Sequence, residues 1–292
     1  MKYFKKHPLI MIVIGVLGIG LSAILVKYSA APSAVTAASR LIWTVLLMSP
    51  AVWGKKNIRT ELFSCGSKTV ILSIVSGIFL AAHFVLWFES LQHTSVASST
   101  ALVCTEVIWV SIGYCLFLKG KITIKAGLAI AIAFIGSVII AFADSTSEAH
   151  LLGDALSLAS AIAVAVYMLL GREVRKKAST TVYTYLVYSA CALSLLILCV
   201  AQDTHLFGYG ISPVIVGLLL SAFSTLLGHS IFSWCLKFFS PSFISAAKLL
   251  EPVVAALLAV FLFAEIPSPL QILGALFILG GVFWYSRIEK AQ

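Results

Sequence analysis

The stretch Leu249–Val282 reads LLEPVVAALLAVFLFAEIPSPLQILGALFILGGV. Two long apolar runs flank the segment AEIPSP, and Glu251 and Pro252 lie inside the first run. A helix needs about 20 apolar residues to cross about 30 Å of hydrocarbon, so each run predicts a membrane span. The whole chain has this character, because 61% of its 292 residues are hydrophobic and 11% are charged. This composition excludes a water-soluble globular protein.

Ten apolar segments of this kind fill the chain and leave no room for a soluble domain. Their long uninterrupted runs favour helices over the alternating strands of a membrane barrel. We therefore predict an all-α membrane protein with ten transmembrane helices. The expected spans are residues 8–28, 33–53, 69–90, 95–118, 124–143, 151–171, 181–200, 212–236, 242–263 and 268–286.

The charged residues predict how these spans are oriented. The chain has 20 Lys and Arg against 11 Asp and Glu. If the N-terminus is inside, almost all basic residues fall in inner segments such as 55–59 and 172–177, and outer loops carry acids such as Asp203. The positive-inside rule then places both termini in the cytoplasm and the protein in the cytoplasmic membrane. The basic excess thus reflects topology in the bilayer, and no nucleic-acid partner is expected.

A shift of 145 residues, the separation of Glu106 from Glu251, superposes the two halves of the chain. It also brings Gly136 onto Gly281. We infer a duplication, with one five-helix repeat in residues 1–146 and a second in residues 147–292. Because five is odd, the two copies must be inverted relative to each other. Inverted repeats are typical of secondary transporters, whose substrate site lies near the midplane between the repeats.

Two stretches carry a family resemblance: Leu249–Val282 and its first-half partner Thr94–Val138. Arg40 in the second span and a GD…Y…GR run in the sixth add to it. On these residues the chain resembles the drug/metabolite transporter superfamily, in its EamA-type branch. One departure is the loop Lys119–Lys121, which lacks the acid that Glu265 supplies in the second half. The resemblance implies a carrier for a small molecule, with the fifth and tenth spans as scaffold or dimer surface, so a monomer or a homodimer is expected.

Four charged residues fall deep inside the expected spans: Arg40, Glu106, Lys248 and Glu251. Each costs roughly 2.5–3.5 kcal/mol at the bilayer centre on insertion scales, so they must face a cavity or each other. Lys248 and Glu251 share a helix face, and Pro252 can break that helix beside them. The guanidinium of Arg40 suits a carboxylate or phosphate, or it is held permanently by Glu106 or Glu251. Glu106 and Glu251 could take a cationic group or protons; the alternative is a structural ion pair.

His83 and His229 lie one residue apart under the 145-residue shift. They are candidates for a ligand or proton role, although a lone membrane histidine is more often a packing residue. No second ligand follows either histidine by three or four residues, so no metal site is expected. Further aromatic residues could line the site by stacking or cation–π contact, or could simply pack in the core: Trp87, Trp109, Tyr167 and Tyr185.

These residues lead to one functional expectation. We expect a secondary transporter of small organic metabolites that works by alternating access. The balanced signs of its buried charges favour export of amino acids or related zwitterions, with proton coupling left open and no cofactor. An exporter of drugs or cationic compounds is the alternative. A membrane enzyme is disfavoured, because the chain has no GxSxG, HExxH or P-loop motif.

Overall fold

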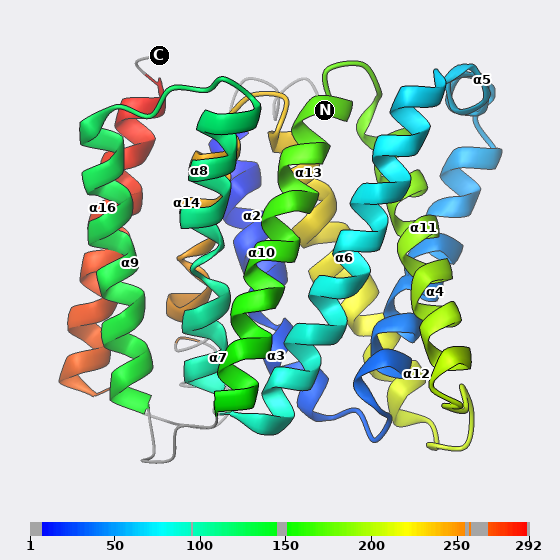
Figure 1. Cartoon of the computed structure of the whole chain (residues 1–292), viewed down its shortest axis with the longest axis horizontal. Coiled ribbons are helices and arrows are strands. Elements are labelled where there is room, and N and C mark those ends of the chain that lie inside the picture. Colours follow the sequence, from blue (N-terminus) through cyan, green and yellow to red (C-terminus); the bar gives the residue numbers. More distant parts are fainter. Residues whose placement is uncertain (1–7, 95, 145–150, 255–256, 258–267, 291–292) are drawn as a thin grey trace.

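The computed structural model describes residues 8–94, 96–144, 151–254, 257 and 268–290. The regular elements in these ranges are all helices (Figure 1). Within the described part of the chain, seven helical segments are long and apolar enough to cross a membrane. They comprise α2 and α3 (Pro8–Gly20, Ser22–Lys27), α4 (Ser33–Trp53), α6 (Ser67–His93), α10 (Leu151–Val174), α11 (Thr180–Ala201), the run α12, η1 and α13 (Ser212–Leu219, Leu220–His229, Ser230–Cys235), and α16 (Pro269–Lys290).

The fourth, fifth and part of the ninth expected spans are also helical. The fourth consists of α7 (Val96–Val103) and α8 (Glu106–Phe117), and the fifth is α9 (Ile124–Asp144). The ninth begins with α14 (Pro241–Lys248), but residues 255–256 and 258–267 lie outside the described part of the chain. The structure therefore confirms a helical, multi-pass membrane protein, and the count of ten spans stays a prediction.

One described helix was not expected from the sequence. α5 (Lys56–Ser64) follows α4 and buries none of its residues. It is too short and too polar to cross a bilayer, and Figure 1 shows it end-on, across the direction of the spans. Its Phe63 ring packs edge-on against Trp53 at the end of α4, with 6.1 Å between ring centroids. The segment that joins the second and third spans is thus a short exposed helix, not a loop.

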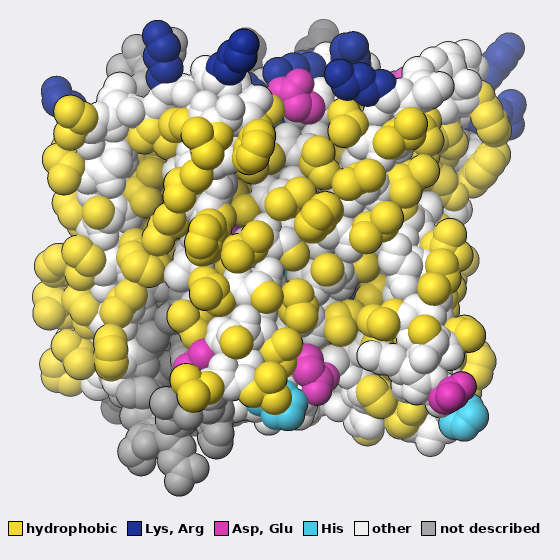
Figure 2. All heavy atoms as spheres, in the orientation of Figure 1, with side chains coloured by type: hydrophobic (Ala, Val, Ile, Leu, Met, Phe, Trp, Pro, Cys, Tyr) yellow, Lys and Arg dark blue, Asp and Glu magenta, His cyan; other side chains and the backbone are white. Residues whose placement is uncertain are grey.

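The two ends of the molecule differ in charge. Lys and Arg gather at the upper end in Figure 2, and acidic and histidine side chains show at the lower end. α2 begins and α16 finishes at the basic end (Figure 1). Between the ends lies a belt of exposed apolar side chains, among them Leu17, Ile71 and Leu193. This distribution matches the charge pattern from which the orientation was predicted, although which end faces the cytoplasm stays a prediction.

Close contacts between helices follow the 145-residue shift. A Cβ added to Gly136 on α9 would lie 2.5 Å from the carbonyl oxygen of Gly274 on α16. One added to Gly281 on α16 would lie 2.7 Å from the carbonyl oxygen of Ala129 on α9. The shift converts the first contact into the second. The shift also places α4 on α11 and the start of α6 on α12. The contact between α6 and α11 in the structure therefore corresponds to the contact between α12 and α4. Such exchange of partners is what a twofold relation between two repeats produces.

Candidate functional site

Two helices at the centre of the molecule are interrupted at equivalent positions. A turn at Cys104 and Thr105 separates α7 from α8, and a turn at Leu249 and Leu250 follows α14. The two turns lie 145 residues apart. At Thr105, Leu249 and Leu250 the backbone N–H bonds a carbonyl three residues back instead of four, as from Leu250 N to Ala247 O at 3.1 Å. Both repeats therefore carry the same break, which leaves polar backbone near mid-depth.

Pro252 explains only part of this geometry. α14 ends at Lys248, whose carbonyl would otherwise bond the missing N–H of Pro252. In the first repeat Val107 occupies the equivalent position, and there its N–H reaches Cys104 O at 3.4 Å. Since the break forms there without proline, Pro252 reinforces it in the second repeat but is not required for such a break.

The interrupted helices are joined by a buried ion pair. Nζ of Lys248 donates to both carboxylate oxygens of Glu106, each at 2.7 Å. The two side chains are 11% and 3% exposed. Glu106 also lies in the first turn of α8, where the helix dipole favours a negative charge. The bond links the two halves of the chain. Lys248 is therefore matched with the acid of the other repeat, and not with its near neighbour Glu251.

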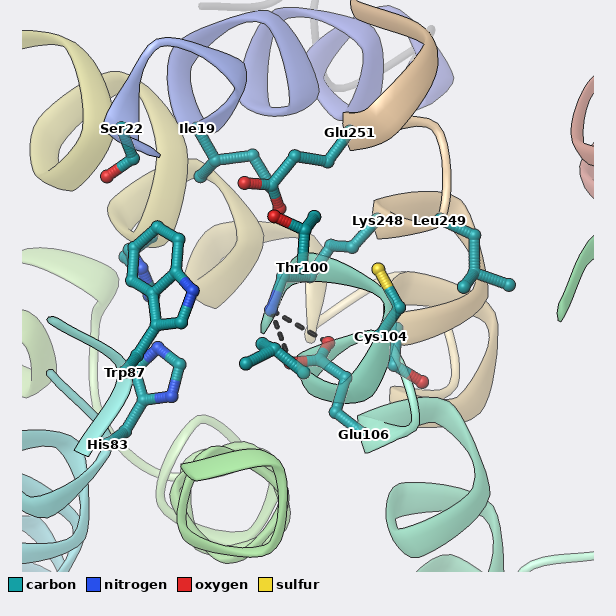
Figure 3. Close-up of a pocket in the computed structure, with 13 residues that line it drawn as sticks. Ile19, Ser22, His83, Trp87, Thr100, Cys104, Glu106, Lys248, Leu249 and Glu251 are labelled. Atoms are coloured by element: carbon teal, nitrogen blue, oxygen red, sulfur yellow. Dashed lines mark hydrogen bonds and ion pairs between the residues drawn. The ribbon is translucent and has the colours of Figure 1, made fainter. Parts of the chain in front are cut away.

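A pocket opens beside this ion pair and encloses about 520 Å³ of empty space, its mouth included. Six of the residues singled out from the sequence meet there, and both halves contribute (Figure 3). The lining residues are Ile19, Ser22, His83, Trp87, Thr100, Val103, Cys104, Glu106, His229, Ser245, Lys248, Leu249 and Glu251.

Two polar groups in the pocket lack partners. Glu251 points into the open space in Figure 3, and it forms no hydrogen bond or ion pair with another described residue. The indole Nε1 of Trp87 is buried without a hydrogen-bond partner in the described part of the chain. Unsatisfied buried polar groups are rare in proteins and call for an explanation. A bound ligand would satisfy both groups.

The two histidines form the wall behind Trp87. His83 stacks on the indole, with 6.1 Å between ring centroids and 11° between planes. Its Nδ1 lies 2.8 Å from Ser160 Oγ and 3.2 Å from Ser160 O. Because a carbonyl oxygen only accepts, we assign the proton to Nδ1. His229 ends the π-helix η1, and its ring centroid lies 6.3 Å from that of His83. These contacts fix the ring of Trp87 in place.

Arg40 lies beneath the pocket and does not line it. Its side chain is fully buried, its Nε donates to Thr225 Oγ1 at 2.7 Å, and its guanidinium lies 4.1 Å above the centre of the Phe84 ring. Nη1 reaches Ser22, which does line the pocket, at 3.5 Å, and Nη2 has no partner among the described residues. No described carboxylate lies within ion-pair distance. The permanent Arg40–glutamate pair considered from the sequence is therefore absent here.

The other aromatic candidates lie outside the pocket. Tyr167 packs behind His229, with 6.0 Å between ring centroids, and its hydroxyl bonds Ser233. Trp109 is partly buried on α8, and its Nε1 lacks a described partner. Tyr185 is remote, because its hydroxyl accepts from Trp53 Nε1 at 3.0 Å, near the end of α4. Tyr188, three residues further along α11, is fully buried.

Sequence reasoning passed over several pocket residues. Ser22, Thr100 and Cys104 line the space, and none of them is among the candidates named from the sequence. Their small size gave no signal. One clue could have placed Cys104 in the pocket. It lies two residues before Glu106, at the position that the 145-residue shift relates to the break in the second repeat.

A bundle of membrane helices with a polar pocket between two twofold-related halves defines the class of membrane transport proteins. The profile of the EamA-like transporter family matches residues 7–142 and 151–287, one match in each half. The chain belongs to the EamA-like transporter family, and it is a transporter.

Two individual proteins extend this comparison. An "uncharacterized transporter" of Clostridium kluyveri is 23% identical over 261 residues, which cover 86% of this chain and 83% of that one. A protein solved by crystallography superposes with a TM-score of 0.79 at 14% identity, covering 98% of this chain and 99% of that one. The second likeness concerns the fold alone.

Proposed function

We propose that this protein is a secondary transporter that moves small organic metabolites by alternating access. The observation that carries the proposal is the pocket at the two helix breaks, lined from both halves. The breaks lie at equivalent positions of residues 1–146 and 147–292, so rocking of one repeat against the other would exchange their environments. The pocket would then open to one side of the cytoplasmic membrane and afterwards to the other.

Amino acids and related compounds are the first substrates to consider, with export as the direction. Their ammonium group suits the unpaired carboxylate of Glu251, and their polar atoms suit Trp87 Nε1. Glu251 could also take up a proton when no substrate is bound, which would couple transport to the proton gradient. A carrier of this kind needs no cofactor and breaks no bond.

Uptake of labelled amino acids into proteoliposomes tests the proposal. We expect Glu251→Gln to reduce the rate at least about tenfold, because a charge-assisted hydrogen bond is lost. The matched control is Glu89→Gln, since Glu89 lies outside the pocket and pairs with His93 at 3.2 Å. Transport by Glu251→Gln at the rate of the Glu89→Gln control would remove Glu251 from the mechanism.

Cys104 gives a direct test of alternating access. In a variant that keeps Cys104 as its sole cysteine, a charged thiol reagent should react from one face of the membrane, and substrate should change the rate. A variant that keeps only the exposed Cys115 is the control, and its reaction should not respond to substrate. Identical behaviour of the two cysteines would contradict the mechanism.

Export of drugs or other organic cations is a second candidate, and the unpaired Glu251 favours it. A strain that overproduces the protein would then resist toxic cations. Resistance that disappears in Glu251→Gln, without amino-acid transport, would select this candidate over the first.

A further inference from the structure

The pocket is asymmetric where the two repeats should match. The 145-residue shift relates Glu106 to Glu251 and Val103 to Lys248, and all four residues line the pocket. Val103 is the equivalent of Lys248 and lines the same pocket as Glu251, so the twofold relation predicts that it faces Glu251 as Lys248 faces Glu106. One repeat therefore supplies a lysine for the opposite glutamate, and the other supplies valine.

This asymmetry leaves Glu251 without a cationic side chain at ion-pair distance among the described residues. Glu106 and Lys248 neutralise each other at 2.7 Å. Among the described lining residues, Lys248 is the sole Lys or Arg, and Arg40 is engaged with Thr225 and Phe84 beneath the pocket. An unpaired carboxylate is costly in a low-dielectric interior unless a cation reaches it. A substrate carboxylate, in contrast, would find no unpaired Lys or Arg among the described residues that line the pocket.

The second unpartnered group restricts the ligand further. Trp87 is 5% exposed, and Figure 3 shows its indole nitrogen turned towards the open space. An indole N–H donates and cannot accept, so a ligand must bring an acceptor atom to it. The stacked ring of His83, itself anchored on Ser160, keeps the indole in this orientation. The site thus requires a cation and an acceptor in one molecule.

We propose that Glu251 and Trp87 form a subsite for a ligand with one net positive charge, holding its ammonium or guanidinium group on Glu251 and a neutral carbonyl or hydroxyl oxygen on the indole N–H. The inference rests on the proposed function, because it takes this pocket as the transport site. It narrows that function by ranking organic cations above zwitterions. Free amino acids, whose carboxylate meets no free charge, bind more weakly than their amides.

Thermal stabilisation of the purified protein by three matched compounds tests this charge rule. For each of alanine, leucine and phenylalanine, the probes are the amide, the free amino acid and the N-acetyl amide. The amide carries the ammonium and a neutral carbonyl, the free acid adds a carboxylate, and the N-acetyl amide lacks the cation. We expect at least one amide to bind about tenfold or more tighter than its two partners.

Three variants identify the residues. Glu251→Gln should weaken amide binding at least about tenfold. Val103→Lys keeps Glu251 but supplies the missing lysine, so it should weaken binding as much by forming a second ion pair. Val103→Met adds comparable length without charge, so it measures the effect of bulk alone, and the loss of binding in Val103→Lys should exceed it about tenfold. Unchanged melting temperatures without ligand would show that the variants are folded.

Several results would overturn the inference. One such result is that no amide binds. A second is that the free acids or the N-acetyl amides bind as tightly as the amides or more tightly. A third is that amide binding survives Glu251→Gln or Val103→Lys. Transport of free amino acids, measured in parallel, distinguishes failure of the proposed subsite from failure of the proposed transport function. If transport persists while the charge rule fails, the subsite is wrong and the transporter proposal stands.

Discussion

Lys248 shows how local geometry selects the partner of a buried charge. In the sequence it stands three residues before Glu251, a spacing that places two side chains on one helix face. α14 ends at Lys248, however, so the helical geometry that this spacing assumes does not continue to Glu251. The ammonium group reaches across to Glu106 instead. The charge was predictable from the sequence, but its partner depended on where the helix ended.

Removing one member of this pair should cost more than removing both. Lys248→Met leaves Glu106 charged and buried, with an expected loss of about 3–5 kcal/mol in the free energy of unfolding. The double variant Glu106→Gln, Lys248→Met should recover much of that loss. Unfolding titrations in detergent measure each variant, and purely additive losses would contradict a coupled pair.

Arg40 should be sensitive even to a change that keeps its charge. Arg40→Lys removes the Nε bond to Thr225 and the planar contact with Phe84. We expect a loss of about 1.5–3 kcal/mol in unfolding free energy. Thr225→Val removes the same bond from the other side, so combining the two changes should add little. Full additivity in the same titrations would show that the bond has no stabilising role.

At the scale of elements, the interrupted helices and the tight contact of α9 with α16 have different roles. The breaks expose polar backbone and side chains to the pocket. The glycines of α9 and α16 bring two backbones together away from the pocket. Close approach of this kind depends on the absence of side chains, because membrane helices gain stability through packing and not through the hydrophobic effect.

Two glycines of α9 provide a matched comparison. A Cβ on Gly136 would meet the backbone of α16, whereas one on Gly127 would meet nothing within 4 Å. Gly136→Ala should therefore destabilise the protein by about 1–3 kcal/mol. Gly127→Ala should be neutral or stabilising by up to about 1 kcal/mol, because alanine favours a helix. Equal effects in unfolding titrations would mean that this contact does not hold the helices together.

At the scale of the molecule, the separation of charge between the two ends determines how the protein lies in the bilayer. Lys176 and Lys177 follow α10, which ends on the basic side of the molecule, while Gln202 and Asp203 follow α11, which ends on the other side (Figure 1). The positive-inside rule assigns the basic end to the cytoplasm.

Labelling of single cysteines in intact cells tests this orientation. In a background without other cysteines, Gln202→Cys should react with a membrane-impermeant reagent. Lys177→Cys should react only after the membrane is permeabilised. The reverse pattern would invert the topology, and labelling of both sites in intact cells would contradict the intervening span α11 (Thr180–Ala201).

Much of the fold was present in the sequence, because burial in lipid demands long apolar helices and duplication leaves a constant offset. The segments around Ser33–Trp53 and Thr180–Ala201 were placed to within a residue or so. α5 was missed because a short, exposed amphipathic segment resembles a charged loop. The extent of η1 was also missed, since a π-helix depends on packing around residues such as Thr225 and not on composition.

By itself, the sequence determined that the chain spans a membrane, that its halves are related, and which few charges must avoid lipid. Those properties follow from transfer free energies summed along the chain. The tertiary structure decided how the charges are shared. It paired Glu106 with Lys248, set Arg40 beneath the pocket, and left Glu251 open beside Trp87. Such pairing depends on distances of a few ångströms between residues far apart in the chain. Helical periodicity relates only residues that are close in the sequence, so it does not predict these distances.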